Sequence, residues 1–385
     1  MNTKQLQFLA DIQTGPFGSQ LHKEDYVEIG TPIVTVEHLG NRIFTEQNLP
    51  RVSDDDKARL EKYVLQHGDI VFSRVGSVDR CSFVDEKHDG WLFSGRCLRV
   101  RPNEQIDAMY LYYYFCMEET KQFVRNIAVG ATMPSINTKL MGEVPITYPS
   151  LIEQKRTAKI LAAIDDRIEN NTKINDNLAE MLQSIYQQRF NSFDSDEEHG
   201  VLADICDYSK DRIAVSSLSV SNYYSTENML PGKAGAVDAS SLPTITQTTK
   251  CKIGDVLISN IRPYFRKIVY CQSDCGCSTD VLCFRPKTSA LSAYLFSTLY
   301  ADRFFDFMVA GSKGTKMPRG DKQQIMTYAV HIPSDEELDD FNALAKPLLA
   351  QIENNRLENI NLCTLRQGLL PKLMSGEIDV SDIQL

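Results

Sequence analysis

The stretch EQKRTAKILAAIDDRIENNTKINDNLAEMLQSIYQQRF, residues 153–190, contains neither glycine nor proline and predicts a single long helix. Apolar side chains and two asparagines recur through it in alternating steps of three and four residues. This is the spacing of a coiled-coil seam, the stripe of side chains that faces a partner helix. The seam positions are Leu161, Ile164, Ile168, Asn171, Asn175, Leu178, Leu182 and Ile185.

The same seam returns 184 residues later in the chain. Its second copy consists of Ala345, Leu348, Ile352, Asn355, Asn359, Leu362, Arg366 and Leu369, so both asparagines are repeated. An asparagine in a seam costs stability and is best explained as fixing the register with a matching partner. We therefore expect the two helices to pair with each other in antiparallel orientation. The alternative is that each is an amphipathic helix lying on its own domain.

The sequence around these helices is also duplicated. GDIVFS from Gly68 returns as GDVLIS from Gly254, and GATMP from Gly130 returns as GTKMP from Gly314. Short β-type runs broken by glycine, proline and aspartate precede each helix and predict a mixed α/β globule. The fold class is therefore α+β, with two α/β domains in tandem, two long helices in an antiparallel coiled coil and internal pseudo-two-fold symmetry. The predicted segments are 1–150 (first domain), 151–192 (central helix), 193–333 (second domain) and 334–385 (C-terminal helix), with an acidic linker at 191–200.

The composition of the chain is that of an ordinary globular protein. The 385 residues carry a formal charge of −10, which argues against general affinity for polyanions but does not exclude local DNA contacts. A hydrophobic content of 42% supports ordinary globular cores. The sequence has no apolar run that could cross a membrane and no signal-peptide pattern, so we expect a cytoplasmic protein whose ten cysteines are reduced.

No complete catalytic motif is present. Phosphate-binding, dinucleotide-binding, nucleophile-elbow and zinc-protease patterns are all missing. The triplet Asp85-Glu86-Lys87 could be part of a nuclease site, although charged triplets are common in surface turns. Four clustered cysteines could hold zinc, but their spacing is unusual and buried thiols on adjacent strands are the alternative. These cysteines are Cys271, Cys275, Cys277 and Cys283.

Polar and cationic side chains gather in turns at equivalent points of the two repeats. Arginine and asparagine can read base edges by paired hydrogen bonds, whereas lysine and backbone amides hold phosphates. An ordinary solvated loop is the alternative for any one of these residues. The candidate DNA-binding residues are Ser73, Arg74, Arg80, Thr132, Ser135, Asn137 and Lys139 in the first repeat, and Asn260, Arg262, Arg266, Lys313, Lys316, Arg319 and Lys322 in the second.

Several of these segments resemble the specificity subunit of type I restriction-modification systems. In the first half they are TGPFGSQLHKEDYVEIGTPIV at 14–34, GDIVFSRVG at 68–76 and, above all, the helix at 153–190. In the second half, YYSTENMLPGKAGAVD at 223–238 and GDVLISNIRPYFRK at 254–267 resemble a different target recognition domain of the same family. The second domain opens with YSKDRIAVSSL and lacks the GPFGS motif, so we expect two different half-sites whose sequences cannot be deduced.

The resemblance implies a DNA-recognition subunit that is not an enzyme. Each target recognition domain would read one half of a bipartite asymmetric site in double-stranded DNA, and the helices would fix the spacing and dock two methyltransferase subunits. Separate restriction subunits would complete the complex, with no membrane partner. No cofactor is expected in this chain, because S-adenosylmethionine, ATP and magnesium would belong to the partners. The alternatives are a tandem-repeat nuclease or other DNA-modifying enzyme, and a structural coiled-coil scaffold.

Overall fold

A computed structural model describes residues 1–16, 20–190 and 199–381. Two compact units divide the chain: Met1–Ile168 with Ile360–Leu385, and Glu169–Asn359. The long helices α5 (Leu151–Phe190) and α10 (Asp335–Ser375) each contribute one part to each unit, so the units cut across the four predicted segments. Residues 17–19 of the GPFGS motif and 191–198 of the predicted linker lie outside the described residues.

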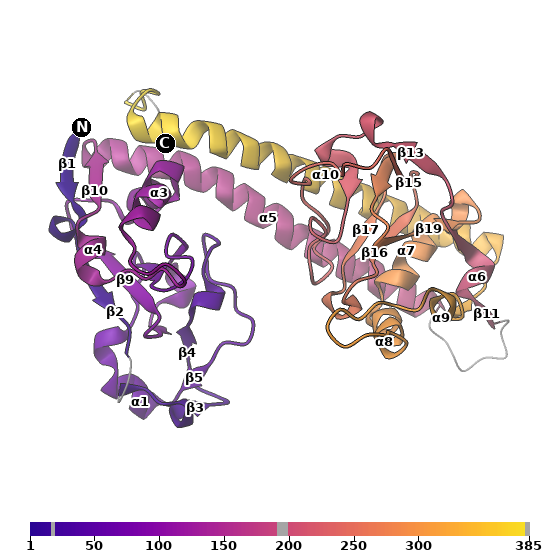
Figure 1. Ribbon diagram of the computed structural model, residues 1–385, viewed down its shortest axis with the longest axis horizontal. Coiled ribbons are helices and arrows are strands. Elements are labelled where there is room, and N and C mark those ends of the chain that lie inside the picture. Colours follow the sequence, from indigo (N-terminus) through magenta and orange to yellow (C-terminus); the bar gives the residue numbers. More distant parts are fainter. Residues whose placement is uncertain (17–19, 191–198, 382–385) are drawn as a thin grey trace. The chain divides into compact units, whose positions relative to one another are not determined.

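The first unit contains two four-stranded sheets and a two-stranded ladder (Figure 1). The strands, in sheet order, are β2 (Ala10–Thr14), β9 (Cys97–Pro102), β6 (Ile70–Ser73) and β7 (Cys81–Phe83); β3 (Tyr26–Val27), β5 (Arg51–Val52), β4 (Thr31–Val34) and β8 (Leu92–Phe93); and β1 (Asn2–Gln5) with β10 (Pro145–Tyr148). All neighbours are antiparallel except β4 and β8. The shorter helices are α1 (Asp54–Arg59), α2 (Ala108–Cys116), α3 (Glu118–Ile127) and α4 (Thr138–Gly142).

The second unit repeats most of this arrangement, including one parallel pair, β14 with β18. In its second sheet, however, the strand equivalent to β8 is an inner strand, whereas β8 itself lies at the edge. Its strands, in sheet order, are β12 (Cys206–Tyr208), β19 (Val281–Pro286), β16 (Val256–Ser259) and β17 (Ile268–Tyr270); β13 (Arg212–Ala214), β15 (Gln247–Cys251), β18 (Cys275–Cys277) and β14 (Tyr223–Tyr224); and β11 (His199–Val201) with β20 (Ala329–His331). Its shorter helices are α6 (Leu202–Ile205), α7 (Ser292–Tyr300), α8 (Asp302–Ala310) and α9 (Lys322–Ile325). The duplicated sequence is therefore a duplicated fold.

In each unit two apolar cores lie on opposite faces of a central strand. In β6, Ile70 and Phe72 point into the core that includes α2 and the long helices, whereas Val71 points into the core beneath the second sheet. The equivalent strand β16 sends Val256 and Ile258 to one core and Leu257 to the other. Because side chains alternate along a strand, the continuous apolar runs DIVFS and DVLIS fit a strand buried on both faces.

The long helices pair in antiparallel orientation within each unit. In the second unit, Asn171 Nδ2 donates to Asn359 Oδ1 at 2.9 Å, and Asn355 Nδ2 donates to Asn175 Oδ1 at 2.8 Å. The higher-numbered residue of α5 contacts the lower-numbered residue of α10, so the helices are antiparallel. The 184-residue repeat converts the first contact into the second, and a local pseudo-two-fold axis therefore passes between the two contacts. The predicted fold class is confirmed. Every predicted seam residue is buried or half-buried.

One layer of the helix pair differs between the units. In the first unit, Arg366 Nη1 lies 2.5 Å from Asp165 Oδ1, and Tyr113 donates its hydroxyl to Asp165 Oδ2 at 2.8 Å. The repeat places Leu182 where Arg366 lies and Leu349 where Asp165 lies, and both leucines are buried in the second unit's core. The polar layer of one unit is therefore replaced by an apolar layer in the other. No helix in the described ranges has the length and apolar character needed to cross a membrane.

Candidate nucleic-acid interface

Two surface loops are joined to each other in each unit, and we call them the paired loops. In the first unit they are residues 74–80, which follow β6, and residues 128–137, which connect α3 to α4. The amide of Gly76 donates to the carbonyl oxygen of Pro134 at 2.8 Å. In the second unit the paired loops are residues 260–267 and 311–322, and the amide of Arg262 donates to the carbonyl oxygen of Pro318, also at 2.8 Å. The same construction thus occurs in both units.

The longer loop of each pair contains a glycine with a positive φ angle near its start. Gly130 has φ +112° and Gly314 has φ +104°, a region that side chains with a Cβ rarely adopt. A Cβ on Gly130 would also lie 2.7 Å from the carbonyl oxygen of Met133. These glycines allow the chain to turn back and form the backbone bridges between positions 129 and 135 and between 313 and 319.

The second unit's paired loops contain cationic side chains that form ion pairs with described residues and others that do not. Lys313 Nζ lies 2.6 Å from Asp321 Oδ2, and Arg319 Nη2 lies 3.0 Å from an oxygen of Asp280. The hydrogen bond from Lys313, together with two amides at the start of α9, holds the pKa of Asp321 below its ordinary value, so this carboxylate stays charged. Three further cations are exposed and, among the residues that the structure describes, form no ion pair. They are Arg262, Lys316 and Lys322.

The turn after β16 holds two arginines in the left-handed conformation. Arg262 has φ +50° and Arg266 has φ +51°. Arg266 is bound to α8 through Asp302 at 2.8 Å and Asp306 at 3.2 Å, so its guanidinium is directed to the protein. Arg262 has no such partner among the described side chains, and the repeat places a glycine, Gly76 with φ +74°, at its position. Because arginine is strained in this conformation and glycine is not, the presence of Arg262 here suggests that its side chain has a function.

Four predicted DNA-binding residues are buried or hydrogen-bonded within the protein. Ser73 is buried, and its hydroxyl donates to the carbonyl oxygen of Val75 at 2.7 Å. Asn137 caps α4 by accepting the amide of Leu140 at 2.9 Å. The hydroxyl of Ser135 donates to the carbonyl oxygen of Val129 at 3.2 Å, and the side chain of Asn260 is buried. We therefore leave Ser73, Ser135, Asn137 and Asn260 out of the interface.

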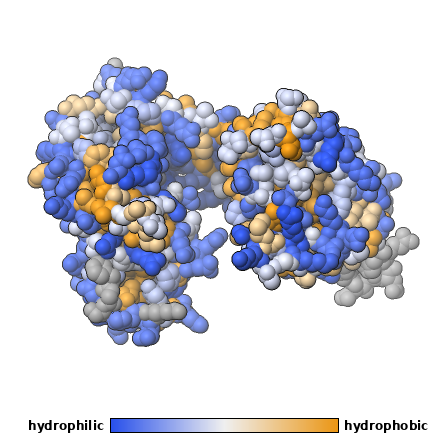
Figure 2. Space-filling view, in the orientation of Figure 1, coloured by the Kyte–Doolittle hydropathy of each residue, from blue (hydrophilic) through white to orange (hydrophobic). Residues whose placement is uncertain are grey.

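The first unit presents less positive charge than the second. Its exposed candidates are Arg80, Thr132, Asn137 and Lys139. Arg80 also donates to the carbonyl oxygen of Leu39, and the half-buried Arg74 donates to that of Gly95 at 3.4 Å. The sequence analysis missed the apolar side chains of the paired loops, because it considered only polar residues. The exposed members of this apolar set are Val129, Met133, Tyr264, Phe265 and Met317. Figure 2 shows apolar patches among largely hydrophilic side chains on the visible face of each unit.

The structure does not support the nuclease triplet. Asp85 caps a short 3₁₀ turn by accepting the amide of His88, and Lys87 Nζ lies 2.6 Å from Glu46 Oε1. Both side chains are therefore engaged in local contacts and do not converge on an open site.

The clustered cysteines fill an apolar core. With Cys251 they belong to the core beneath the second sheet of the second unit, where Cys275 Sγ lies 3.6 Å from Cys271 Sγ. Cys277 takes the place that Phe93 has in the first unit. In the described ranges 1–16, 20–190 and 199–381, no three His, Cys, Asp or Glu side chains are placed to hold a metal ion. The buried-thiol interpretation is therefore the one that the geometry supports.

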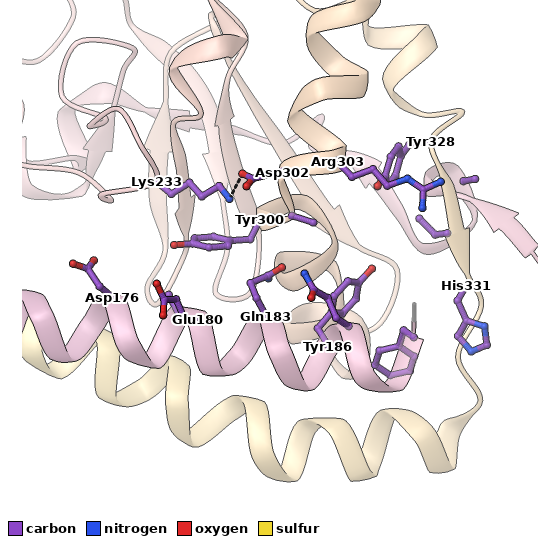
Figure 3. Close-up of a pocket in the computed structure, with 16 residues that line it drawn as sticks. Asp176, Glu180, Gln183, Tyr186, Lys233, Tyr300, Asp302, Arg303, Tyr328 and His331 are labelled. Carbon is purple, nitrogen blue, oxygen red and sulfur yellow. Dashed lines mark hydrogen bonds and ion pairs between the residues drawn. The ribbon is translucent and has the colours of Figure 1, made fainter. Parts of the chain in front are cut away.

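A polar cavity of about 540 Å³ lies between α5 and the sheet-bearing part of the second unit (Figure 3). Asp176 and Glu180 point into it from α5, opposite Lys233 and Tyr300. Lys233 is already satisfied, since its Nζ lies 2.6 Å from Asp302 Oδ1 and 4.6 Å from the ring centre of Tyr300. None of the predicted DNA-binding residues lines this cavity.

The duplicated fold agrees with comparisons to known proteins. Residues 1–180 match the family model described as Type I restriction modification DNA specificity domain. The first half of the chain is therefore a type I restriction modification DNA specificity domain. The chain is 24% identical over 312 residues to the MjaIX specificity subunit of Methanocaldococcus jannaschii, covering 74% of this chain and 72% of that relative.

Two further proteins are similar to this chain, one over part of its sequence and one over nearly its whole fold. A putative specificity subunit, MjaX from the same organism, is 31% identical over 151 residues, or 38% of this chain and 36% of that one. The crystal structure of the S subunit from M. genitalium aligns with a TM-score of 0.59 at 15% identity, covering 97% of this chain and 95% of that chain. At this identity the match shows the fold, and it extends over both halves of this chain.

Proposed function

We propose that this chain is a specificity subunit that reads a bipartite, asymmetric site in double-stranded DNA, one half with the paired loops of each unit. The observation that carries the proposal is the recurrence of the same paired loops on two copies of one fold. Their side chains differ: Arg80 and Thr132 are exposed in the first unit, and Arg262, Lys316 and Lys322 in the second. Equivalent scaffolds with different contact residues are suited to reading two different half-sites.

The proposal extends to the rest of the complex. Two methyltransferase subunits would dock on the long helices, and restriction subunits would join them, while this chain remains non-catalytic and acts in the cytoplasm. S-adenosylmethionine, ATP and magnesium would serve the partners. Support comes from exposed apolar side chains on α5 and α10. Met181 is 52% exposed and Leu365 is 49% exposed, and the repeat relates these positions, as two copies of one partner would require.

The test is to map methylated adenines across the genome of a host with and without this gene. A bipartite motif that depends on the gene is the expected result, and it would give both half-sites directly. Methylation that is the same in both hosts would contradict the proposal.

Replacing Lys316 or Lys322 by alanine should weaken DNA binding equally at specific and non-specific sites. Each removes one uncompensated cation, so the slope of log K against log salt should become shallower by about 0.9. Binding of the assembled complex would be titrated over a series of salt concentrations. Lys87, which is exposed but lies outside the paired loops, provides the control for an equal change of charge. A slope unchanged in both loop variants would place the loop away from DNA.

Replacing Arg262 by glycine should separate stability from recognition. The turn should gain about 1 kcal/mol, because the left-handed conformation costs nothing for glycine. Specific binding should lose about 1 to 3 kcal/mol if the guanidinium contacts a base. Thermal unfolding and competition binding measure the two effects, and Arg262→Ala, which keeps the Cβ, should lose binding without the gain in stability. Unaltered discrimination between cognate and altered sites in both variants would argue against base contact.

A further inference from the structure

The longer paired loops of the two units share three residues in the pattern Gly-x-x-Met-Pro, although their other residues differ. The glycines at 130 and 314 are explained by their positive φ angles. The prolines supply the carbonyls that join each loop to its neighbour. The backbone of the loop therefore accounts for the glycine and the proline, but not for the methionine between them.

Packing inside the protein does not explain the two methionines. Met133 is 67% exposed and Met317 is 51% exposed, and neither belongs to an apolar core. A methionine is a flexible apolar side chain that gains free energy when it is covered. Its presence at the same exposed position in two otherwise different loops points to a surface that covers it in both units.

We propose that Met133 and Met317 each make an apolar contact with base pairs of the half-site that their unit reads. This inference rests on the proposed function of the paired loops. Methionine is among the side chains that proteins place against thymine methyl groups or between base steps. Such a contact would hold the tip of each loop in a groove, while neighbouring polar residues read the sequence.

The charges beside Met317 favour DNA as the covering surface. Lys316 precedes it with no ion-pair partner among the described residues, and Lys313 and Arg319 lie in the same loop. On the adjoining loop, Tyr264 is 49% exposed and Phe265 is 39% exposed, so further apolar area lies near these cations. Apolar and aromatic side chains among lysine and arginine match a polyanion that carries stacked bases. A methyltransferase subunit covering these loops is the competing outcome of the test.

The experiment measures DNA affinity of the complete complex with a cognate duplex over a series of salt concentrations. Met317→Ala and Met133→Ala should each reduce affinity about tenfold, as expected for losing roughly one buried apolar side chain. The salt slope should stay unchanged, because an apolar contact releases no counterions. Met317→Leu and Met133→Leu should keep most of the affinity. The matched control is Ile253→Ala, since Ile253 is 68% exposed in the second unit and lies outside the paired loops.

Three outcomes overturn different statements. Wild-type affinity in both alanine variants would refute the methionine contacts and leave the proposed function standing. Alanine variants that fail to assemble with the methyltransferase in the absence of DNA would show that these residues face that subunit, and would also refute the inference. A wild-type complex that neither binds nor methylates any DNA would instead refute the proposed function.

Discussion

Replacing Arg366 by leucine should lower the free energy of unfolding by about 2 to 4 kcal/mol. The change leaves the Asp165 carboxylate, 5% exposed, with the hydrogen bond from the Tyr113 hydroxyl but without its cation. Removing one partner of a buried ion pair usually costs about 3 to 5 kcal/mol. The value here should be somewhat smaller because 36% of the Arg366 side chain is exposed to solvent. Chemical denaturation, followed by circular dichroism, measures it.

The other unit supplies the control for this prediction. Asp165→Leu combined with Arg366→Leu copies the arrangement of Leu182 and Leu349, and should recover most of the lost stability. Adding Tyr113→Phe should recover more, because the double variant leaves the Tyr113 hydroxyl without its acceptor. If the double variant were as unstable as Arg366→Leu alone, the ion pair would have a role that an apolar layer cannot fill.

Removing one helical turn from each long helix should shorten the unread spacer between the half-sites by one or two base pairs. The first seam, Leu161 to Ile185, spans 25 residues and roughly 36 Å, close to one turn of duplex DNA. Deleting four residues shortens a helix by about 6 Å and changes its rotation by about 40°. One base pair of DNA corresponds to a rise of about 3.4 Å and a rotation of about 34°. The rotation of the shortened helix therefore matches the loss of one base pair, whereas its shortening is close to the rise of two.

The deletion is best made around the Asn175–Asn355 contact, removing residues 172–175 and 355–358 together so that Asn171 and Asn359 keep their pairing. The methylated sequence of a host carrying this variant would be determined. Both half-sites should be unchanged and only their separation altered. An altered half-site with the original spacer would show that the helices do not set the spacing.

The helices and the duplication could be predicted from sequence because both signals are local or repetitive. The helix predicted from residue 151 ends at Phe190, and the seam lies where the heptad spacing places it. The pairing of short strands could not be predicted, because β3 and β14 have two residues each and are held by partners distant in sequence. The contribution of Asp165 was also missed, since a lone aspartate beside a seam looks like an ordinary solvated charge.

The candidate interface was predicted in part, for a physical reason. Asn137 and Ser73 have the side chains that read DNA, but the same chemistry caps helices and ties turns, and only burial and hydrogen bonding distinguish the two uses. Lys316 stays a prediction: it is exposed in a glycine-containing loop, as a phosphate contact would require. Met133 and Met317 were missed because apolar residues are expected in cores, and only the structure shows that these two lie outside.

Because the chain contains two related helices, each helix could pair with its own counterpart in a second molecule instead of with the other helix of the same chain. Since the two helices are related by the repeat, α5 could pair with α5 of a second molecule in the register that it now uses with α10. Such an exchange would set Asp165 against Leu182 at two places, leaving two carboxylates in an apolar layer without arginine. A matching exchange between two copies of α10 would set Arg366 against Leu349. The mismatched layers therefore penalise pairing between copies and favour the helix pair within one chain, which keeps two different half-site readers in a single molecule.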